Sequence, residues 1–383
     1  MSGRVAIIGA GPGGLSAARE AASLGLSVTI FEKAAVGEKI NCAEGYFDML
    51  KLLGPPLAGV LFKVSEIVLC VRDTFTIDCS KHHLWMIDRS RWQKALADDA
   101  CRMGCRLYEH SPVTPEKFPQ LEKEYDWIID ASGPSPVSRK IFSLPAGRSA
   151  VTAQYTLSGD FSDLYGKLKV TAEKQNCCYS WIFPRGKDSA NVGVGYFGTR
   201  DSHKSIADTL KEIIKRENLQ SYRVLRRAGG LLPVNRRKKV LIGKTMLAGD
   251  AAALSSPLHG GGIDNACISG ILAARAIAAH KPAEYEKSLK KILGGRLNVE
   301  QKMLDAWEKL SLAELNEYLH TCFGSGIQTS NLSKLKLALT QEAAIVKYIL
   351  GGQVRADWNK GIVTDGLPFT ARILLRKLMT EEG

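Results

Sequence analysis

The chain has 383 residues, 45% hydrophobic and 24% charged, a composition typical of folded globular domains that excludes a disordered chain. This length predicts two or three domains, and the absence of an apolar run of about 20 residues predicts no membrane span. Lys and Arg exceed Asp and Glu by 13, and residues 201–383 carry +10 of that excess, which favours an anionic partner for this part of the chain.

The nine cysteines contain no CxxC pair and no metal-ligand spacing. This pattern argues against both a disulfide framework and a zinc site. We expect a cytoplasmic protein in a reducing setting, at most peripheral to a membrane.

The first 32 residues have the pattern of a dinucleotide-binding unit. Residues 4–9 form a short β-branched run, residues 15–25 an alanine-rich helix closed by glycine, and residues 26–31 a second strand that ends at Glu32. The turn between the first strand and the helix contains Gly9, Gly11, Gly13 and Gly14. Glycines permit the tight turn and the approach of a pyrophosphate to the helix N-terminus. Glu32, with the adjacent Lys33, is expected at the ribose.

Two later segments repeat the motif of a buried strand that ends in an acid. Residues 124–130 end at Asp130 and lead to Gly133, and a third element over residues 239–250 ends at Gly249 and Asp250. After it come Pro257, the triplet Gly260, Gly261 and Gly262, and a long apolar helix from Ile263 to about residue 279. An acid at a strand end can bind sugar or ribityl hydroxyls, and a glycine-rich helix start can approach a flat ring.

Together with residues 88–96, these segments resemble the FAD-dependent oxidoreductases of the aromatic-hydroxylase type over residues 4–50, 85–142 and 238–280. The resemblance implies FAD as the cofactor, with Arg89 near the flavin. The residues expected at the cofactor are Gly9, Gly11, Gly13, Gly14, Glu32, Lys33, Cys42, Ala43, Arg89, Asp130, Gly133, Gly249, Asp250, Pro257, Gly260, Gly261, Gly262 and Ile263.

The predicted fold class is α/β with mixed α+β character. A Rossmann-like FAD-binding domain with a parallel sheet is expected from residues 1–60, 85–150 and 236–282. An antiparallel substrate sheet is inserted into it, over residues 61–84 and 151–235. Residues 283–383 form a helical C-terminal region, with amphipathic helices over 281–319 and short basic ones at 332–339 and 370–379. Packing of the basic helices onto the body is favoured over membrane contact.

Two further segments resemble the geranylgeranyl reductase family. They are Cys42-Ala43-Glu44-Gly45 and the stretch Tyr179-x-Trp181-x-Phe183-Pro184. The resemblance implies hydride transfer from reduced FAD to isoprenoid double bonds of a lipid or prenyl substrate, with Cys42, Tyr179 and Trp181 as the catalytic candidates. Cys42 either donates a proton or lines the pocket. Tyr179, Trp181 and Phe183 alternate and so share one face of a strand, which is either a sheet core or an aromatic wall of the site.

Other functions share the same FAD domain. A flavin monooxygenase or halogenase of a small aromatic is one alternative, and a non-catalytic, flavin-stabilised lipid-binding protein is another. A transient electron donor is required, and NAD(P)H, a ferredoxin or a deazaflavin would each serve.

Residues 223–244 hold eight basic side chains and no acidic one. They form either a solvated face or a contact for a phosphorylated prenyl substrate, a lipid headgroup or an anionic membrane surface. Aromatic interleaving is missing, so no nucleic acid partner is expected.

Overall fold

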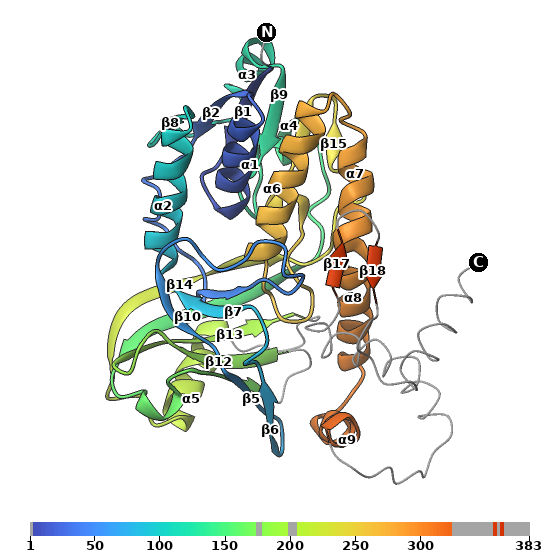
Figure 1. Cartoon of the computed structure of the whole chain (residues 1–383). Helices are drawn as coiled ribbons and strands as arrows, with labels where there is room; N and C mark the ends of the chain where they lie inside the picture. Colours follow the sequence, from blue (N-terminus) through green and yellow to red (C-terminus); the bar gives the residue numbers. More distant parts are fainter. Residues whose placement is uncertain (1–2, 174–177, 198–204, 324–354, 358–360, 364–383) are drawn as a thin grey trace, which may run out of the picture.

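The computed structural model describes residues 3–173, 178–197, 205–323, 355–357 and 361–363. In Figure 1 a parallel sheet with its helices forms the upper part of the molecule, and an antiparallel sheet forms the lower part. The predicted basic helices at 332–339 and 370–379 lie outside the described residues. The confirmed fold class is mixed α/β, with parallel and antiparallel sheets.

The parallel part is a six-stranded sheet in the order β15-β16-β9-β1-β2-β8. Strand β1 pairs in parallel with β2 and β9, as buried apolar strands flanked by helices do. The strands are β1 (Arg4–Ile8), β2 (Ser27–Phe31), β8 (Arg106–Tyr108), β9 (Trp127–Asp130), β15 (Leu241–Ile242) and β16 (Thr245–Leu247). The helices around it are α1 (Pro12–Ser23), α2 (Arg89–Arg102), α3 (Phe118–Glu124), α4 (Val137–Ile141) and α6 (Ile263–Ala278), with the 3₁₀ turn η2 (Gly249–Ala252).

The third strand differs from the expectation. The sequence predicts one element over residues 239–250, whereas the structure has an antiparallel hairpin there, formed by β15 and β16. Gly243 has φ of +56°, a left-handed conformation that lets the chain reverse there. Only β16 continues the parallel sheet, beside β9.

The antiparallel part is a seven-stranded sheet in the order β14-β10-β13-β12-β11-β5-β6. Its strands are β5 (Glu66–Cys70), β6 (Thr74–Asp78), β10 (Ser149–Ser158), β11 (Lys167–Ala172), β12 (Cys178–Pro184), β13 (Ser189–Tyr196) and β14 (Arg223–Pro233). Helix α5 (Ile206–Arg216) covers one face and buries Leu210 and Ile213 against it. The 3₁₀ turn η1 (Ser162–Leu164) precedes β11. One pair in the sheet, β5 with β11, is parallel.

A three-stranded sheet and the C-terminal helices complete the described fold. The small sheet has the order β3-β7-β4, formed by β3 (Gly45–Phe47), β4 (Val60–Lys63) and β7 (Leu84–Ile87). The helices are α7 (Glu284–Leu289), a π-helical turn η3 (Lys290–Gly294), α8 (Gly295–Trp307) and α9 (Leu312–Phe323), and β17 (Arg355–Asp357) pairs with β18 (Gly361–Val363). Within the described ranges no helix is both long and apolar enough to cross a membrane.

Candidate active site

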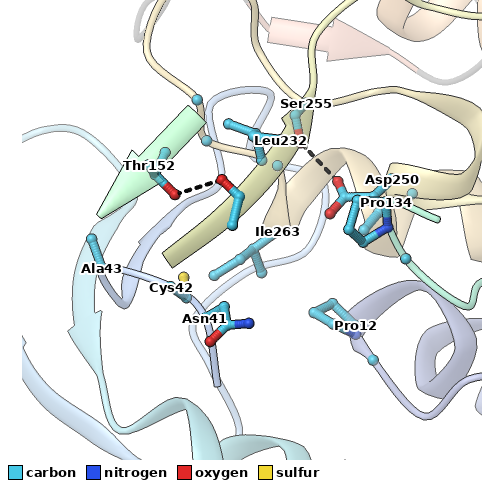
Figure 2. Close-up of a pocket in the computed structure, with 18 of the residues that line it drawn as sticks. Pro12, Asn41, Cys42, Ala43, Pro134, Thr152, Leu232, Asp250, Ser255 and Ile263 are labelled. Atoms are coloured by element: carbon cyan, nitrogen blue, oxygen red, sulfur yellow. Dashed lines mark hydrogen bonds between the residues drawn. The ribbon is translucent and has the colours of Figure 1, made fainter. Parts of the chain in front are cut away.

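A cavity of about 1080 Å³ extends from the glycine turn after β1 to helix α9. Side chains from both large sheets line it. Figure 2 shows Pro12 of α1, Asp250 of η2 and Ile263 of α6 around the same space as Cys42 and Thr152. The cavity therefore has a nucleotide-type end in the parallel part and a second end in the antiparallel part.

The glycine turn leaves room for a ligand beside the backbone. Gly9 has φ of +97°, and a Cβ there would lie 2.6 Å from the carbonyl oxygen of Ala131. A Cβ on Gly11 would meet no atom within 4 Å, so the backbone faces open space at that point. Helix α1 begins at Pro12 without a side-chain cap, and its first N–H groups are available to an anion. This cradle fits a pyrophosphate.

Glu32 lies at the end of β2, beside the turn. Its Oε2 accepts a 2.7 Å hydrogen bond from the N–H of Ala10, and its Oε1 accepts one from Ala34 at 3.2 Å. Both Glu32 and Lys33 line the cavity. The two backbone bonds fix the carboxylate at the position where the sequence predicts a ribose.

Asp250 lies on the opposite wall, in η2. Its Oδ1 accepts a 2.8 Å hydrogen bond from Ser255 Oγ, drawn in Figure 2. Burial raises the pKa of the Asp250 carboxyl above its usual value. Gly249, the triplet Gly260–Gly262 and Ile263 line the cavity next to it. A hydroxyl ligand of Asp250 would therefore approach from the cavity side.

Arg89 begins helix α2 and also lines the cavity. Its Nε donates to Gln93 Oε1 at 2.8 Å, and Gln93 Nε2 donates to the carbonyl oxygen of Ala10 at 3.2 Å. Gln93 lies one helical turn after Arg89, and this spacing is the signal in the sequence that could have identified it.

Three residues assigned to the cofactor do not line the cavity: Gly14, Asp130 and Pro257. A Cβ on Gly14 would lie 1.9 Å from the carbonyl oxygen of Gly9, so this glycine packs α1 against β1. The carboxylate of Asp130 is fully buried and accepts hydrogen bonds from the backbone of Ser132 and Ser138. Asp130 organises the turn after β9, because its oxygens are already occupied there. Gly133 and Ala43 do line the cavity.

The aromatic residues of β12 face this cavity. Tyr179, Trp181 and Phe183 all line it, which confirms the prediction that they share one face. The ring of Tyr179 stacks on Phe197 with centroids 5.0 Å apart and lies 6.4 Å from the ring of Trp307. The three aromatic residues of β12 thus belong to an aromatic wall that also includes Phe197, directly after β13, and Trp307 of helix α8.

His259 connects this wall to the loop before α6. Its carbonyl oxygen accepts a 2.7 Å hydrogen bond from the hydroxyl of Tyr179, and its Nδ1 accepts one from the N–H of Gly261 at 3.1 Å. Its Nε2 lies 3.9 Å from Oε1 of Glu300, a buried residue of α8. Burial lowers the pKa of His259, which favours a neutral ring that supports the glycine triplet.

The far end of the cavity is apolar. Apolar side chains from the β5–β6 hairpin, β11, α8 and α9 form it, among them Ile67, Leu69, Val71, Ile77, Leu168, Val170, Met303, Leu315 and Leu319. Oδ1 of Asn316, in α9, accepts hydrogen bonds from the N–H groups of Arg72 and Asp73 at the tip of the β5–β6 hairpin. This end is built from segments far apart in the sequence, so no motif predicted it.

The basic stretch 223–244 is divided between two environments. Arg223, Arg226 and Arg227 lie on β14, the edge strand of the antiparallel sheet. Arg237 and Lys244 instead donate to backbone carbonyl oxygens of Ala251 and Tyr125 in the parallel part. The stretch is therefore not one continuous basic patch.

Comparison with known proteins indicates the same cofactor and the same family as the motifs in the sequence. A family model described as the geranylgeranyl reductase catalytic domain matches residues 150–232, and one described as an FAD binding domain matches residues 4–58. The chain is 27% identical to a digeranylgeranylglycerophospholipid reductase of Methanothrix thermoacetophila, over 87% of this chain and 93% of that protein. It is 30% identical to the enzyme of that name from Methanosarcina acetivorans, over 71% of this chain and 74% of that protein.

Solved structures show the same fold. A geranylgeranyl bacteriochlorophyll reductase-like protein from Thermoplasma acidophilum has a TM-score of 0.74 at 21% identity, covering 91% of this chain and 98% of that one. A flavin-dependent halogenase, CmlS, has a TM-score of 0.67 at 16% identity, covering 100% and 78%. The cradle, the matched FAD binding domain and the curated relatives lead to one conclusion: the chain belongs to the geranylgeranyl reductase family and is an FAD-dependent reductase of isoprenoid carbon–carbon double bonds.

Proposed function

We propose that the substrate is a phospholipid with geranylgeranyl chains, which lie in the apolar end of the cavity while one double bond at a time is reduced at the boundary with the cradle. The main support for this proposal is that one cavity extends from the nucleotide cradle to an apolar end, which suits a long hydrocarbon chain. The curated relatives, named digeranylgeranylglycerophospholipid reductases, support the same substrate class.

The cradle residues would hold FAD as follows. The N-terminus of α1 and the backbone at Gly11 would bind the pyrophosphate, Glu32 would bind the ribose, and Asp250 would accept a hydrogen bond from a ribityl hydroxyl. The glycine triplet and the N-terminus of α6 would lie next to the ring. FAD, once reduced, supplies the hydride for the reaction.

An isolated alkene has no carbonyl that the protein can polarise, so the chain must be held closely against the hydride donor. The aromatic wall of Tyr179 and Trp181 provides a rigid apolar surface for this purpose. The aliphatic residues of β5 and β11 exclude water from the rest of the prenyl chain.

Each reduction adds a hydride to one carbon and a proton to the other, and it leaves the flavin oxidised. Cys42 is our candidate for the proton donor. Its Sγ accepts a 3.2 Å hydrogen bond from the N–H of Glu44, and this bond does not use the thiol hydrogen. The hydroxyl of Tyr179 donates to His259, which favours a structural role for the phenol.

The anionic headgroup is assigned to the edge strand β14. Gly229, Gly230 and Leu231 of this strand line the cavity, and Arg226 and Arg227 precede them. Leu231 is 57% exposed. An edge with arginines and an exposed leucine next to a cavity mouth is suited to a lipid headgroup at a membrane surface.

The test uses the full-length holoenzyme, reduced anaerobically with dithionite and mixed with vesicles of a geranylgeranyl phospholipid. Mass spectrometry should show a gain of about two mass units per double bond, the mass of the added hydrogens. Unchanged lipid, with oxygen-dependent hydroxylation of an aromatic, would favour the monooxygenase alternative. Tight lipid binding without turnover would favour the lipid-binding alternative. NADPH, a ferredoxin and a reduced deazaflavin are then compared as electron donors.

A further inference from the structure

The loop Cys42–Gly45 contains a strained residue. Glu44 has φ of +70°, a left-handed conformation that is uncommon for residues other than glycine, asparagine and aspartate. It is also a charged residue that is only 2% exposed. Such a conformation persists where the surrounding structure determines it from several sides.

Each backbone carbonyl of residues 42–44 accepts a hydrogen bond from another part of the fold. The side-chain amide of Gln154, on β10, donates to the oxygen of Cys42 at 3.2 Å. Asn191, on β13, donates to the oxygen of Ala43 at 3.1 Å. The N–H of Ile87 donates to the oxygen of Glu44 at 3.0 Å. Two of the three donors are side chains of the antiparallel sheet.

The carboxylate of Glu44 connects the same loop to three elements. Its Oε2 accepts a hydrogen bond from Asn191 Nδ2 at 2.9 Å and forms an ion pair with Arg185, whose Nε lies 2.7 Å away. Its Oε1 accepts from the backbone N–H of Arg89 at 3.2 Å. Because Arg89 begins the helix that faces the cradle, Glu44 fixes the loop relative to both ends of the cavity.

The two amides are themselves oriented by neighbours. Trp181 Nε1 donates to Gln154 Oε1 at 3.2 Å, and Thr156 Oγ1 donates to Asn191 Oδ1 at 2.8 Å. These bonds occupy the amide oxygens, so the NH₂ groups are directed at the loop. The indole of the aromatic wall is thereby linked to Cys42 through a single amide.

We propose that Gln154, Asn191 and Glu44 are positioning residues that hold the Cys42 thiol at the boundary between the cradle and the apolar end. Glu44 also contacts the thiol directly, because its backbone N–H donates a hydrogen bond to Cys42 Sγ. The catalytic part of this inference rests on the proposed role of Cys42, whereas the placement of the thiol does not.

The test compares the holoenzyme with Asn191→Ala and Gln154→Leu, which remove the two donors independently. Iodoacetamide is applied under native conditions, and the rate of alkylation at Cys42 is followed by peptide mass spectrometry. The exposed Cys101 serves as an internal reference. Tyr196→Phe is the matched control, because it removes a buried hydroxyl contact with Thr209 on the α5 side of the same sheet.

We expect both loop variants to change Cys42 alkylation several-fold relative to Cys101, while the control variant leaves it unchanged. With lipid, kcat should fall about tenfold or more at nearly constant KM, because the thiol is misplaced while the chain-binding walls remain. The inference is overturned if both loop variants have the same Cys42 alkylation rate and the same kcat as the control variant. A wild-type enzyme that reduces no lipid would contradict the proposed function, yet the alkylation rates would still report on the loop.

Discussion

The hydroxyl of Tyr179 donates a 2.7 Å hydrogen bond to the carbonyl oxygen of His259. Tyr179 belongs to β12 of the antiparallel sheet, and His259 precedes the glycine triplet at the start of α6. This bond joins the aromatic wall to the loop that we propose as a neighbour of the flavin ring. Under that proposal, the relative placement of hydride donor and prenyl chain would depend on this contact between the antiparallel sheet and the loop before α6.

Replacing Cys42 with alanine tests its chemical role. If the thiol delivers the proton, Cys42→Ala should lower kcat about 10²-fold with little change in KM, as loss of a general acid does. The FAD absorbance and FAD content of the variant are measured in parallel, to verify that it still binds the cofactor. A kcat equal to that of the wild type would mean that Cys42 only lines the cavity.

Replacing Asp250 with alanine tests the cofactor site. Loss of a hydrogen bond to a buried carboxylate should weaken FAD binding by about 2 kcal/mol, or roughly 30-fold. Titration of the apoprotein with FAD, followed by flavin fluorescence, measures this. Asp98→Ala is the control, since Asp98 lies on the exposed face of α2. Equal FAD affinity in the two variants would show that Asp250 does not bind the cofactor.

Leu69 tests the apolar end. It lines the cavity, whereas the preceding residue Val68 does not. Leu69→Trp should raise KM for a geranylgeranyl lipid about tenfold, because displacing two methylenes from the cavity costs about 1.6 kcal/mol. Val68→Trp, on the other face of β5, is the control. FAD affinity should be equal in the two variants, and an unchanged KM in Leu69→Trp would place the chain elsewhere.

The close approach of α1 and α6 predicts that alanine substitutions at two glycines change the free energy of unfolding in opposite directions. A Cβ on Gly270 would lie 2.1 Å from the carbonyl oxygen of Gly13, so Gly270→Ala should lower the free energy of unfolding by about 2 kcal/mol or more. Gly295, in α8, is exposed and has no atom near its Cβ position. Gly295→Ala should instead raise that free energy by about 0.5–1 kcal/mol, through helix propensity. Urea unfolding measures both, and similar effects at the two sites would contradict the packing.

The contact between α9 and the β5–β6 hairpin predicts a pH dependence. Hydrogen bonds from His320, followed by those from Asn316, hold the pKa of Asp73 below its usual 3.8. A lowered carboxyl pKa stabilises the fold above pH 3.8, and this contribution is lost as the pH falls through the folded-state value. Asp73→Asn should therefore flatten the dependence of Tm on pH in the acidic range. Asp163→Asn, at an exposed position of η1, should retain the wild-type slope.

Much of the nucleotide end could be predicted because its requirements are local. Gly9, Gly11 and the strand end at Glu32 follow from backbone geometry and periodicity within about 30 residues. The alternation of Tyr179, Trp181 and Phe183 likewise predicted a shared face. Asp130 had the same local pattern as Asp250, and only the fold showed that the turn around Ser132 and Ser138 occupies its carboxylate.

Local motifs were enough to indicate the FAD-binding class, the resemblance to the family and the candidate residues Cys42, Tyr179 and Trp181. Tertiary structure decided how Cys42 is held, since Gln154 and Asn191 lie more than 100 residues away along the chain. It also decided the length and apolar character of the cavity. The physical reason is that a buried polar group requires a partner, and a cavity requires walls, which only non-local folding brings together.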